Sequence, residues 1–280
     1  MPEVSVIIPT FNRSQKVLRA LASVLYQTFR DYEVVVVNDG STDGTERALE
    51  PFFPNIRYLL HTNNRGVSAA RNSGIRISTS PFLAFLDSDD YWLPEKLSTQ
   101  VAFFKSIPRA VACQTEEIWR RRGRRVNPKK KHIKPSGDIF ASSLERCMVS
   151  PSTVMLRRSL LDEVGLFDET LPACEDYDLW LRIACRYPID LIKTFLAVKE
   201  GGHHDQLSSN TRGLDRLRIQ SLVKLLRSGN LSREQRDLTL KALTLKCRIY
   251  GQGCMKRGKD QEGLSYLHLP KKIRDELSLE

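Results

Sequence analysis

The sequence predicts an α/β fold, in which an open and mostly parallel sheet is flanked by helices and followed by a helical C-terminal extension. Over the first hundred residues, apolar runs typical of buried strands alternate with stretches in which apolar residues recur every three or four positions. Polar clusters follow the first, second and fourth apolar runs. Ligands of such sheets bind beyond the carboxyl ends of the strands, so we expect a binding site where these clusters meet.

Strands and helices alternate along the first half of the chain. Apolar residues rich in Val and Ile predict four strands, at residues 4–8, 32–37, 56–60 and 82–86. Helical periodicity predicts helices between them, at 14–25, 45–52 and 67–77. Ser14 is expected to cap the first of these helices. The segment NDGSTDG at 38–44 has the composition of a turn.

The second half of the sequence is less regular. It predicts helices at 94–105 and 177–185 and strands at 110–115 and 151–156. From about Thr211 onward the chain is expected to be helical, with a break near residues 228–230 (SGN).

Composition places the chain among soluble globular proteins. Of its 280 residues, 41% are hydrophobic and 28% are charged. There is no apolar run long enough to span a membrane and no recognisable signal peptide, so we expect a cytoplasmic location. The six cysteines are scattered without a Cys-x-x-Cys pair, which predicts reduced and mostly structural thiols.

The positive charge of the protein is concentrated in one segment. The net charge is +11, and residues 119–134 (WRRRGRRVNPKKKHIK) contain nine Lys or Arg and no acid, which leaves 11 − 9 = +2 for the rest. This basic segment is compatible with a solvated loop, with a peripheral contact to an anionic membrane, or with steering of an acidic acceptor. Nucleic-acid binding is not expected, because Trp119 is the only aromatic ring in the segment apart from His132.

An acidic cluster follows the fourth predicted strand. Asp87, Asp89 and Asp90 lie within four residues, with Ser88 between them. Carboxylates so close together repel one another unless a cation lies among them, although a solvated turn that caps the next helix is the ordinary alternative. Mg²⁺ and Mn²⁺ prefer oxygen ligands and often bridge carboxylates to substrate phosphates. The cluster therefore predicts a site for one of these two metals.

Five segments in order resemble glycosyltransferase family 2, which has the GT-A fold. They are VSVIIPTFNR, VVVVNDGSTDGT, NRGVSAARNSGI, FLAFLDSDDYW and GLFDETLPACEDYDLWLRIA, and the resemblance covers residues 4–210. It implies a glycosyltransferase domain at 1–210, with a nucleotide-sugar-binding half at 1–105 and an acceptor half at 106–210. Residues 211–280 form the helical C-terminal extension.

The resemblance implies a donor site and a metal site. The residues implied to contact the nucleotide sugar, with a uridine diphosphate donor favoured, are Pro9, Thr10, Asn12, Arg13, Asp39, Arg71, Asp87 and Ser88. Among them, Asp39 is expected to accept a hydrogen bond from the base, and Arg71 to lie near the base or the diphosphate. Asp89 and His203 are implied ligands of Mn²⁺ or Mg²⁺, with Asp90 in support.

The resemblance also implies the chemistry of transfer. Asp176 occupies the position of the general base that deprotonates the acceptor hydroxyl, and Glu175 is the less favoured choice. One base and no carboxylate nucleophile imply a single in-line displacement that inverts the anomeric configuration. The implied acceptor is a saccharide or lipid-linked saccharide in surface-glycan assembly.

Two other classes of function use nucleotides or nucleotide sugars and need comparison with the sequence. A nucleotide-dependent oxidoreductase needs a Gly-rich turn after the first strand, and the segment 9–13 (PTFNR) contains no Gly. A non-catalytic nucleotide-sugar-binding module of the same fold is the alternative that stays open. The four acids Asp39, Asp87, Asp89 and Asp176 argue against this alternative, because all of them are present.

Overall fold

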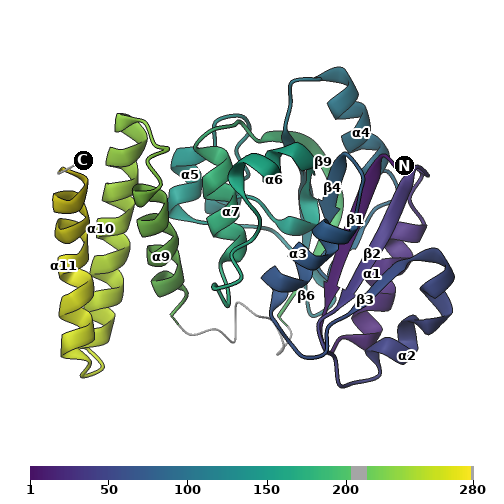
Figure 1. Cartoon of the computed structure of the whole chain (residues 1–280), viewed down its shortest axis with the longest axis horizontal. Helices are drawn as coiled ribbons and strands as arrows, with labels where there is room; N and C mark the ends of the chain where they lie inside the picture. The colour runs from purple at the N-terminus through teal and green to yellow at the C-terminus, as the bar shows by residue number, and fades with distance from the viewer. Residues whose placement is uncertain (203–212, 279–280) are drawn as a thin grey trace.

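Four parallel strands form the N-terminal half of a mixed sheet. The computed structural model describes residues 1–202 and 213–278. The parallel strands are β1 (Val4–Thr10), β2 (Tyr32–Asn38), β3 (Arg57–Leu60) and β4 (Phe82–Phe85). In the middle of this sheet, Ile7 lies opposite Val35 on one side and Phe85 on the other. The four predicted strands are confirmed to within two residues at each end (Figure 1).

The C-terminal half of the sheet contains both parallel and antiparallel pairs. The strand order is β3-β2-β1-β4-β8-β6-β9-β5, with β7 paired to β6 alone. These further strands are β5 (Tyr91–Trp92), β6 (Ala112–Arg121), β7 (Arg124–Val126), β8 (Val154–Arg157) and β9 (Asp190–Gly201). Strands β5, β7 and β9 were not predicted.

The predicted strand at 110–115 was too short. Strand β6 continues into the basic segment as far as Arg121 and turns back into β7, so part of the segment is a hairpin and not a loop. The parallel partner β9 stabilises this extension, because it pairs with β6 from Cys113 to Arg121. The other predicted strand, 151–156, begins later, because residues Pro151–Thr153 form a 3-10 turn (η3).

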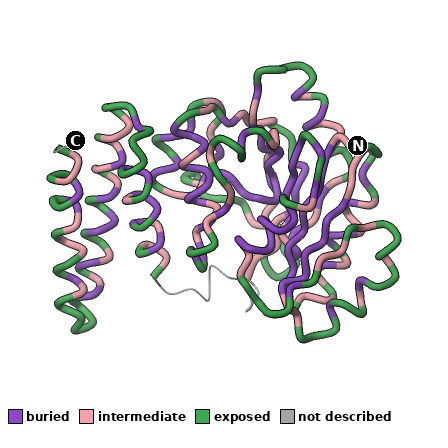
Figure 2. Tube along the Cα trace, viewed as in Figure 1, coloured by how far each residue is buried: buried purple, intermediate pink, exposed green. Residues whose placement is uncertain are grey.

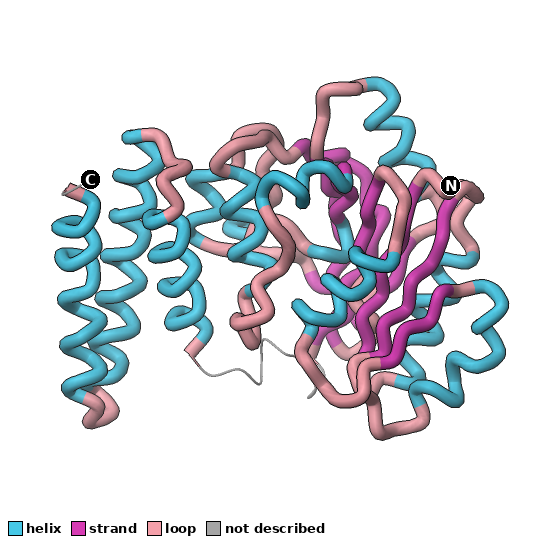
Figure 3. The backbone as a smooth tube through the Cα atoms, in the orientation of Figure 1, coloured by secondary structure: helices cyan, strands magenta, loops and turns pink. Residues whose placement is uncertain are grey.

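Helices cover both faces of the sheet (Figure 3). They are α1 (Ser14–Leu25), α2 (Thr45–Leu49), α3 (Val67–Ile77), α4 (Lys96–Ser106), α5 (Phe140–Glu145), α6 (Arg158–Val164) and α7 (Glu175–Ala184). Strand β1 contributes side chains to the apolar cores on both faces of the sheet. Val6 and Ile8 pack in the core that contains α1 and α4, and Ile7 packs in the core that contains α3 and α7. Alternation of side chains along the strand accounts for these two cores.

Several helix boundaries differ from the prediction. Ser14 is the first helical residue of α1 and not its cap; Arg13 holds the cap position, and the Ser14 amide donates to the Asp43 carboxylate 3.3 Å away. The predicted helix at 45–52 is divided into α2 and a 3-10 helix, η1 (Glu50–Asn55), because Pro51 and Pro54 interrupt the α-helical bonding. Helices α5 and α6 were not predicted.

Three C-terminal helices extend from one end of the molecule (Figure 1). They are α9 (Leu214–Arg227), α10 (Arg233–Met255) and α11 (Asp260–Leu277). A capping box between Ser232 and Gln235 begins α10. Their buried faces (Figure 2) belong to the same apolar cluster as α7, through residues such as Leu222 and Leu243. No helix in the described ranges is both long enough and apolar enough to cross a membrane. All six cysteines are unpaired.

Candidate active site

A cavity of about 1170 Å³ lies at the carboxyl edge of the parallel strands. We call it the central cavity. It is lined by predicted site residues, namely Pro9, Thr10, Asn12, Arg13, Asp39, Arg71, Asp87, Ser88, Asp89 and Asp176. His203, the other predicted metal ligand besides Asp89, lies outside the described residues. The cavity therefore brings together every predicted site residue whose position is described.

The loop after β1 and the turn after β2 hold each other in place. The Asn12 side-chain oxygen accepts a hydrogen bond from the Thr42 amide at 2.8 Å, and the Ser41 hydroxyl accepts one from the Asn12 amide at 2.9 Å. Asn12 adopts a positive φ of 51°, a conformation that Asn tolerates better than most residues. Beside it, the buried Thr10 hydroxyl lines the cavity and has no hydrogen-bond partner among the described residues. A buried hydroxyl without a partner is suited to binding a polar ligand.

Asp39 connects strand β2 to the loop before α3. Its carboxylate accepts hydrogen bonds from the backbone amides of Arg65 (3.0 Å) and Gly66 (2.8 Å) and contacts His61 Nδ1 at 2.6 Å. His61 is in turn bonded through Nε2 to Ser73 of α3. Sequence reasoning missed His61, whose only signal was a His directly after a predicted strand. Asp39 thus holds the loop that forms one wall of the cavity.

Arg71 lies between the two acidic clusters. Its guanidinium contacts Asp87 and Glu175 at 2.6 Å each, and the side chain is 3% exposed. Burial alone would raise the pKa of Asp87, but Arg71 lowers it below its usual value. For Glu175 burial is the larger effect and raises the pKa despite the same arginine. Arg71 was predicted to lie near the donor; it lines the central cavity, but carboxylates of the protein occupy its nearest positions.

The two later acids of the DSDD cluster have different surroundings. Asp89 faces the cavity and pairs with Arg13 at 3.0 Å. Asp90 is buried and accepts hydrogen bonds from the Ser152 hydroxyl (2.6 Å) and the Glu200 amide (3.0 Å). Burial and the nearby Asp89 raise the pKa of Asp90 well above its usual value. Asp90 therefore fastens the cluster to η3 and β9.

The carboxylates at the cavity can accept a hard divalent cation only together with other ligands. In the described part of the chain, no group of three or more His, Cys, Asp or Glu side chains is arranged to hold a metal by itself. Mg²⁺ and Mn²⁺ are commonly bound by one or two carboxylates and the phosphates of a substrate. Asp89, which faces the cavity, fits that donor set.

Asp176 lies in the first turn of α7. Its Oδ1 accepts a hydrogen bond from the Tyr177 amide at 2.7 Å, and its Oδ2 accepts one from the Cys147 thiol at 3.4 Å. Burial, with the nearby Asp176 carboxylate, raises the pKa of Cys147 well above its usual value, so the thiol stays protonated and can donate. The helix N-terminus also favours a negative charge at this position.

Lys199 of β9 is a cavity residue that sequence reasoning missed. Burial would lower the pKa of its ammonium group, but Glu117, Asp90, Asp87 and Asp176 together raise it. The signal was a Lys that ends the apolar run 196–198. Because strand β9 was not predicted, the placement of Lys199 relative to the DSDD cluster could not be inferred from the sequence.

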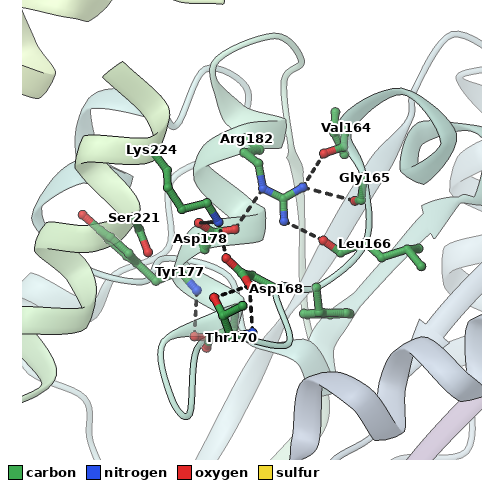
Figure 4. A network of polar contacts seen from close by, with 12 residues as sticks. Val164, Gly165, Leu166, Asp168, Thr170, Tyr177, Asp178, Arg182, Ser221 and Lys224 are labelled. Atoms are coloured by element: carbon green, nitrogen blue, oxygen red, sulfur yellow. Dashed lines mark hydrogen bonds and ion pairs between the residues drawn. The ribbon is translucent and has the colours of Figure 1, made fainter. Parts of the chain in front are cut away.

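A network of ion pairs holds the helix that carries Asp176 (Figure 4). Lys224 of α9 binds both Asp168 and Asp178, the latter at 2.9 Å. Asp178 also binds Arg182 at 2.9 Å, and Arg182 donates to the carbonyl oxygens of residues 164–166. The network therefore joins α7 both to α9 and to the segment that precedes α7.

Comparisons with known proteins agree with this architecture. A model described as glycosyl transferase family 2 matches residues 5–165. An uncharacterized glycosyltransferase of Rickettsia conorii is 32% identical over 231 residues, which are 79% of this chain and 37% of the relative. A UDP-Glc:alpha-D-GlcNAc-diphosphoundecaprenol beta-1,3-glucosyltransferase of Escherichia coli is 30% identical over 212 residues, which are 74% of this chain and 80% of the relative. The alignments span only 26–58% of the length of the Rickettsia relatives.

Two solved structures have the same fold. TarS residues 1–349 of S. aureus, in complex with UDP-GlcNAc, superpose with a TM-score of 0.71 at 19% identity, covering 98% of this chain and 92% of that one. The mannosyltransferase PcManGT of Pyrobaculum calidifontis, in complex with GDP-Man and Mn²⁺, has a TM-score of 0.68 at 19% identity. The superposition covers 99% of this chain and 79% of PcManGT.

The match to the family model covers more than half of the 280 residues. It includes three of the five segments on which the resemblance was based and all but the first residue of VSVIIPTFNR, and it ends at the first residue of the fifth segment. The solved structures support the GT-A fold independently of close sequence identity. The chain is thus a member of glycosyl transferase family 2 with the GT-A fold.

Proposed function

We propose that the protein is a metal-dependent, inverting glycosyltransferase that moves a sugar from a UDP-sugar to a hydroxyl group of a saccharide acceptor. The observation that carries the proposal is the central cavity, in which the DSDD cluster, Asp39 and Asp176 face one space. Family membership supports the reaction class.

The donor is proposed to lie over the loops after β1, β2 and β4. The unpartnered hydroxyl of Thr10 and the carboxylate of Asp39 offer polar contacts to the nucleoside. Asp87 is assigned to the ribose, and Arg13 lies close enough to Asp89 to meet the diphosphate beside it. A uridine nucleotide is favoured because the glucosyltransferase relative is named for UDP-Glc and the TarS structure contains UDP-GlcNAc.

Asp89 is proposed to hold Mn²⁺ or Mg²⁺ together with the donor diphosphate. The bound cation supplies positive charge against the charge that builds on the leaving diphosphate. The Mn²⁺ of the PcManGT complex supports this choice of metal. His203 is retained as a second proposed ligand from the sequence.

Asp176 is proposed to remove the proton of the acceptor hydroxyl as its oxygen attacks the anomeric carbon. Such a base contributes about 10²–10⁴ in rate. The hydrogen bonds from the Tyr177 amide and the Cys147 thiol orient the carboxylate. Attack opposite the departing diphosphate converts an α-linked donor into a β-linked product.

The acceptor is proposed to be a lipid-linked saccharide of surface-glycan assembly. The E. coli relative is named for a GlcNAc-diphosphoundecaprenol substrate, and another relative, from Rhizobium meliloti, is named a succinoglycan biosynthesis protein. Work on such acceptors would place the enzyme at the cytoplasmic face of a membrane. The basic segment 119–134 is the proposed peripheral contact with anionic lipid, because eight of its nine cations are exposed.

The proposal is tested by measuring thermal stability and UDP release with UDP-sugars, in Mn²⁺, Mg²⁺ or chelator. A ligand at 100 times its dissociation constant stabilises the native state by about 2.7 kcal/mol, so binding is seen as a raised melting temperature. Asp89→Asn is expected to abolish the metal-dependent part of that shift, and Asp31→Asn, at an exposed site, to preserve it.

Three outcomes separate the candidate functions. A metal-dependent shift with slow UDP release supports the transferase. A rise in melting temperature with no UDP release, whichever acceptor is added, supports the alternative, a non-catalytic nucleotide-sugar-binding module. A folded protein that no nucleotide stabilises contradicts both.

A further inference from the structure

A second cavity adjoins the central cavity on its acceptor side. It has a volume of about 890 Å³ and lies between α9, α11 and the segment 168–171. We call it the C-terminal groove. Thr170 and Leu171 line both cavities, so the groove and the central cavity meet at this segment. Helix α9 also reaches both: Leu214 and Arg218 line the central cavity, and the next turns of the helix line the groove.

The groove combines apolar walls with cationic edges. Its apolar side chains are Leu171, Ile219, Val223, Tyr266 and Leu269. The charged residues that line it are Asp168, Lys224, Arg227 and Lys272, three cations against one acid. Lys224 and Arg227 are paired with carboxylates, whereas the Lys272 side chain has no ion pair or hydrogen bond among the described residues. A ligand that fits these walls is a flexible apolar chain attached to an anion.

Arg218 places a cation at the entrance from the central cavity. Its Nη1 donates to Asp215 at 3.2 Å, while its buried Nε has no acceptor in the described part of the chain. The guanidinium lies 6.0 Å from the ring centroid of Tyr177, the residue after Asp176. An arginine that has an unpaired Nε and lines the same cavity as the proposed base is suited to a phosphate of the acceptor.

We propose that the C-terminal helices form the acceptor subsite for a prenyl diphosphate: Arg218 contacts the diphosphate, and the C-terminal groove holds the first prenyl units. The proposal rests on the proposed function and deepens it, because it assigns the lipid part of the acceptor to α9 and α11. In this arrangement the sugar lies at Asp176, the diphosphate lies beside α9, and the prenyl chain leaves between α9 and α11.

The test measures binding by calorimetry with saturating UDP and Mn²⁺, which occupy the donor site. The probes are farnesyl diphosphate, ethyl diphosphate and farnesol, all below their aggregation concentrations. Wild-type protein is expected to bind farnesyl diphosphate at least about tenfold more tightly than either of the other two, because only this probe has both the chain and the anion.

Three variants assign the two parts of the subsite. Arg218→Gln is expected to weaken both diphosphates about tenfold. Val223→Glu should remove the advantage of the farnesyl chain while leaving ethyl diphosphate unchanged, and Lys272→Glu, at an exposed edge, should weaken farnesyl diphosphate without disturbing the core. Leu264→Glu introduces the same charge on α11 at an exposed position outside the groove and is expected to bind as wild type.

Equal affinity of the wild type for farnesyl and ethyl diphosphate would contradict prenyl binding in the C-terminal groove. Equal affinity for farnesyl diphosphate and farnesol would contradict the proposed contact of Arg218 with the diphosphate. In both cases bound UDP shows that the donor site is intact, so the proposed function survives. If UDP itself does not bind, the proposed function fails first.

Discussion

Arg71 is the residue on which the geometry of the central cavity most depends. It is buried and contacts one carboxylate from each acidic cluster, Asp87 after β4 and Glu175 at the start of α7. Removing one member of such a buried set leaves uncompensated charge, which typically costs about 3–5 kcal/mol. Arg71 therefore ties the DSDD cluster to the start of α7.

Substitution of Asp176 tests its proposed role as the general base. Asp176→Asn should lower kcat by about 10²–10⁴, because the amide cannot accept the acceptor proton, while its oxygen still accepts the Tyr177 amide. Donor binding should be unchanged, as measured by calorimetry with UDP. Near-normal turnover of this variant would place the base elsewhere, and Asp31→Asn serves as the control for an exposed aspartate.

At the scale of elements, helix α4 contains a buried lysine. Lys96 is fully buried, its Nζ contacts the Gln100 side-chain oxygen at 2.5 Å, and it lies 4.0 Å from the centroid of the Trp92 ring. Burial, aided by Lys134 and opposed by Cys113, lowers its pKa to about 7. The unfolded chain therefore binds more protons at this site than the native state above about pH 7.

The pH dependence of stability follows from that difference. The free energy of unfolding should rise with pH above about 7, by up to about 1.4 kcal/mol per pH unit, because the unfolded state gives up its proton only near the ordinary lysine pKa. Lys96→Met should lack this rise and be more stable near pH 6.5. Denaturant titrations between about pH 6.5 and 8.5 check the prediction, and parallel curves for the two proteins would contradict it.

The β6–β7 hairpin and the residues after it carry the exposed cations. Lys134 differs from the other eight: it is buried, bonds to Thr115 and Thr153, and pairs with Glu117 at 3.3 Å. Burial would raise the pKa of Glu117, but Lys134 and Lys199 lower it to about 2. Lys134 thus anchors the end of the basic segment to the sheet, which leaves the other cations on the surface.

Charge reversal tests the proposed membrane contact. Changing Lys129, Lys130 and Lys131 to Glu should weaken binding to vesicles containing phosphatidylserine, since each basic residue near such a surface contributes about 1 kcal/mol. The matched control changes Lys256, Arg257 and Lys259 at the α10–α11 turn to Glu, so that both triple variants have the same net charge. Equal losses in cosedimentation for the two triple variants would show an effect of net charge alone.

At the scale of the whole molecule, the C-terminal helices belong to the main core. Ile219, Leu222, Leu243 and Ile273 are at most 1% exposed and lie in the same apolar cluster as Tyr177 and Trp180 of α7. Together with the ion pairs of Lys224, this packing makes the start of α7 depend on α9 (Figure 4).

Truncation before α9 tests this dependence. A chain ending at residue 213 should lose cooperative unfolding and expose an apolar surface, because large buried side chains lose their partners. Circular dichroism during heating and binding of a hydrophobic dye measure the two effects. A cooperative transition close to that of the full chain would mean that the helices are a separate unit.

The strands of the N-terminal half, and many of the residues that gather at the central cavity, could be predicted from the sequence alone. Strands β1, β2 and β4 contain apolar runs buried on both faces, so their pattern identifies them without knowledge of their neighbours, whereas the residues of β3 are exposed or half-buried. Polar residues at the carboxyl ends of parallel strands meet at one edge of the sheet. The motifs identified part of the lining of the central cavity, from Pro9 to Asp176, and missed Lys199 and Arg218.

The partners of those residues could not be predicted from the sequence, because they come from distant segments that meet only in the folded chain. Strand β9 has exposed residues at 193–195 and a register shift opposite β6, so no simple alternation reveals it, and Lys199 was missed with it. Arg71 binds Glu175, 104 positions away, and Lys224 binds Asp178 across 46. Local patterns report which faces are apolar, whereas these contacts depend on packing between distant segments.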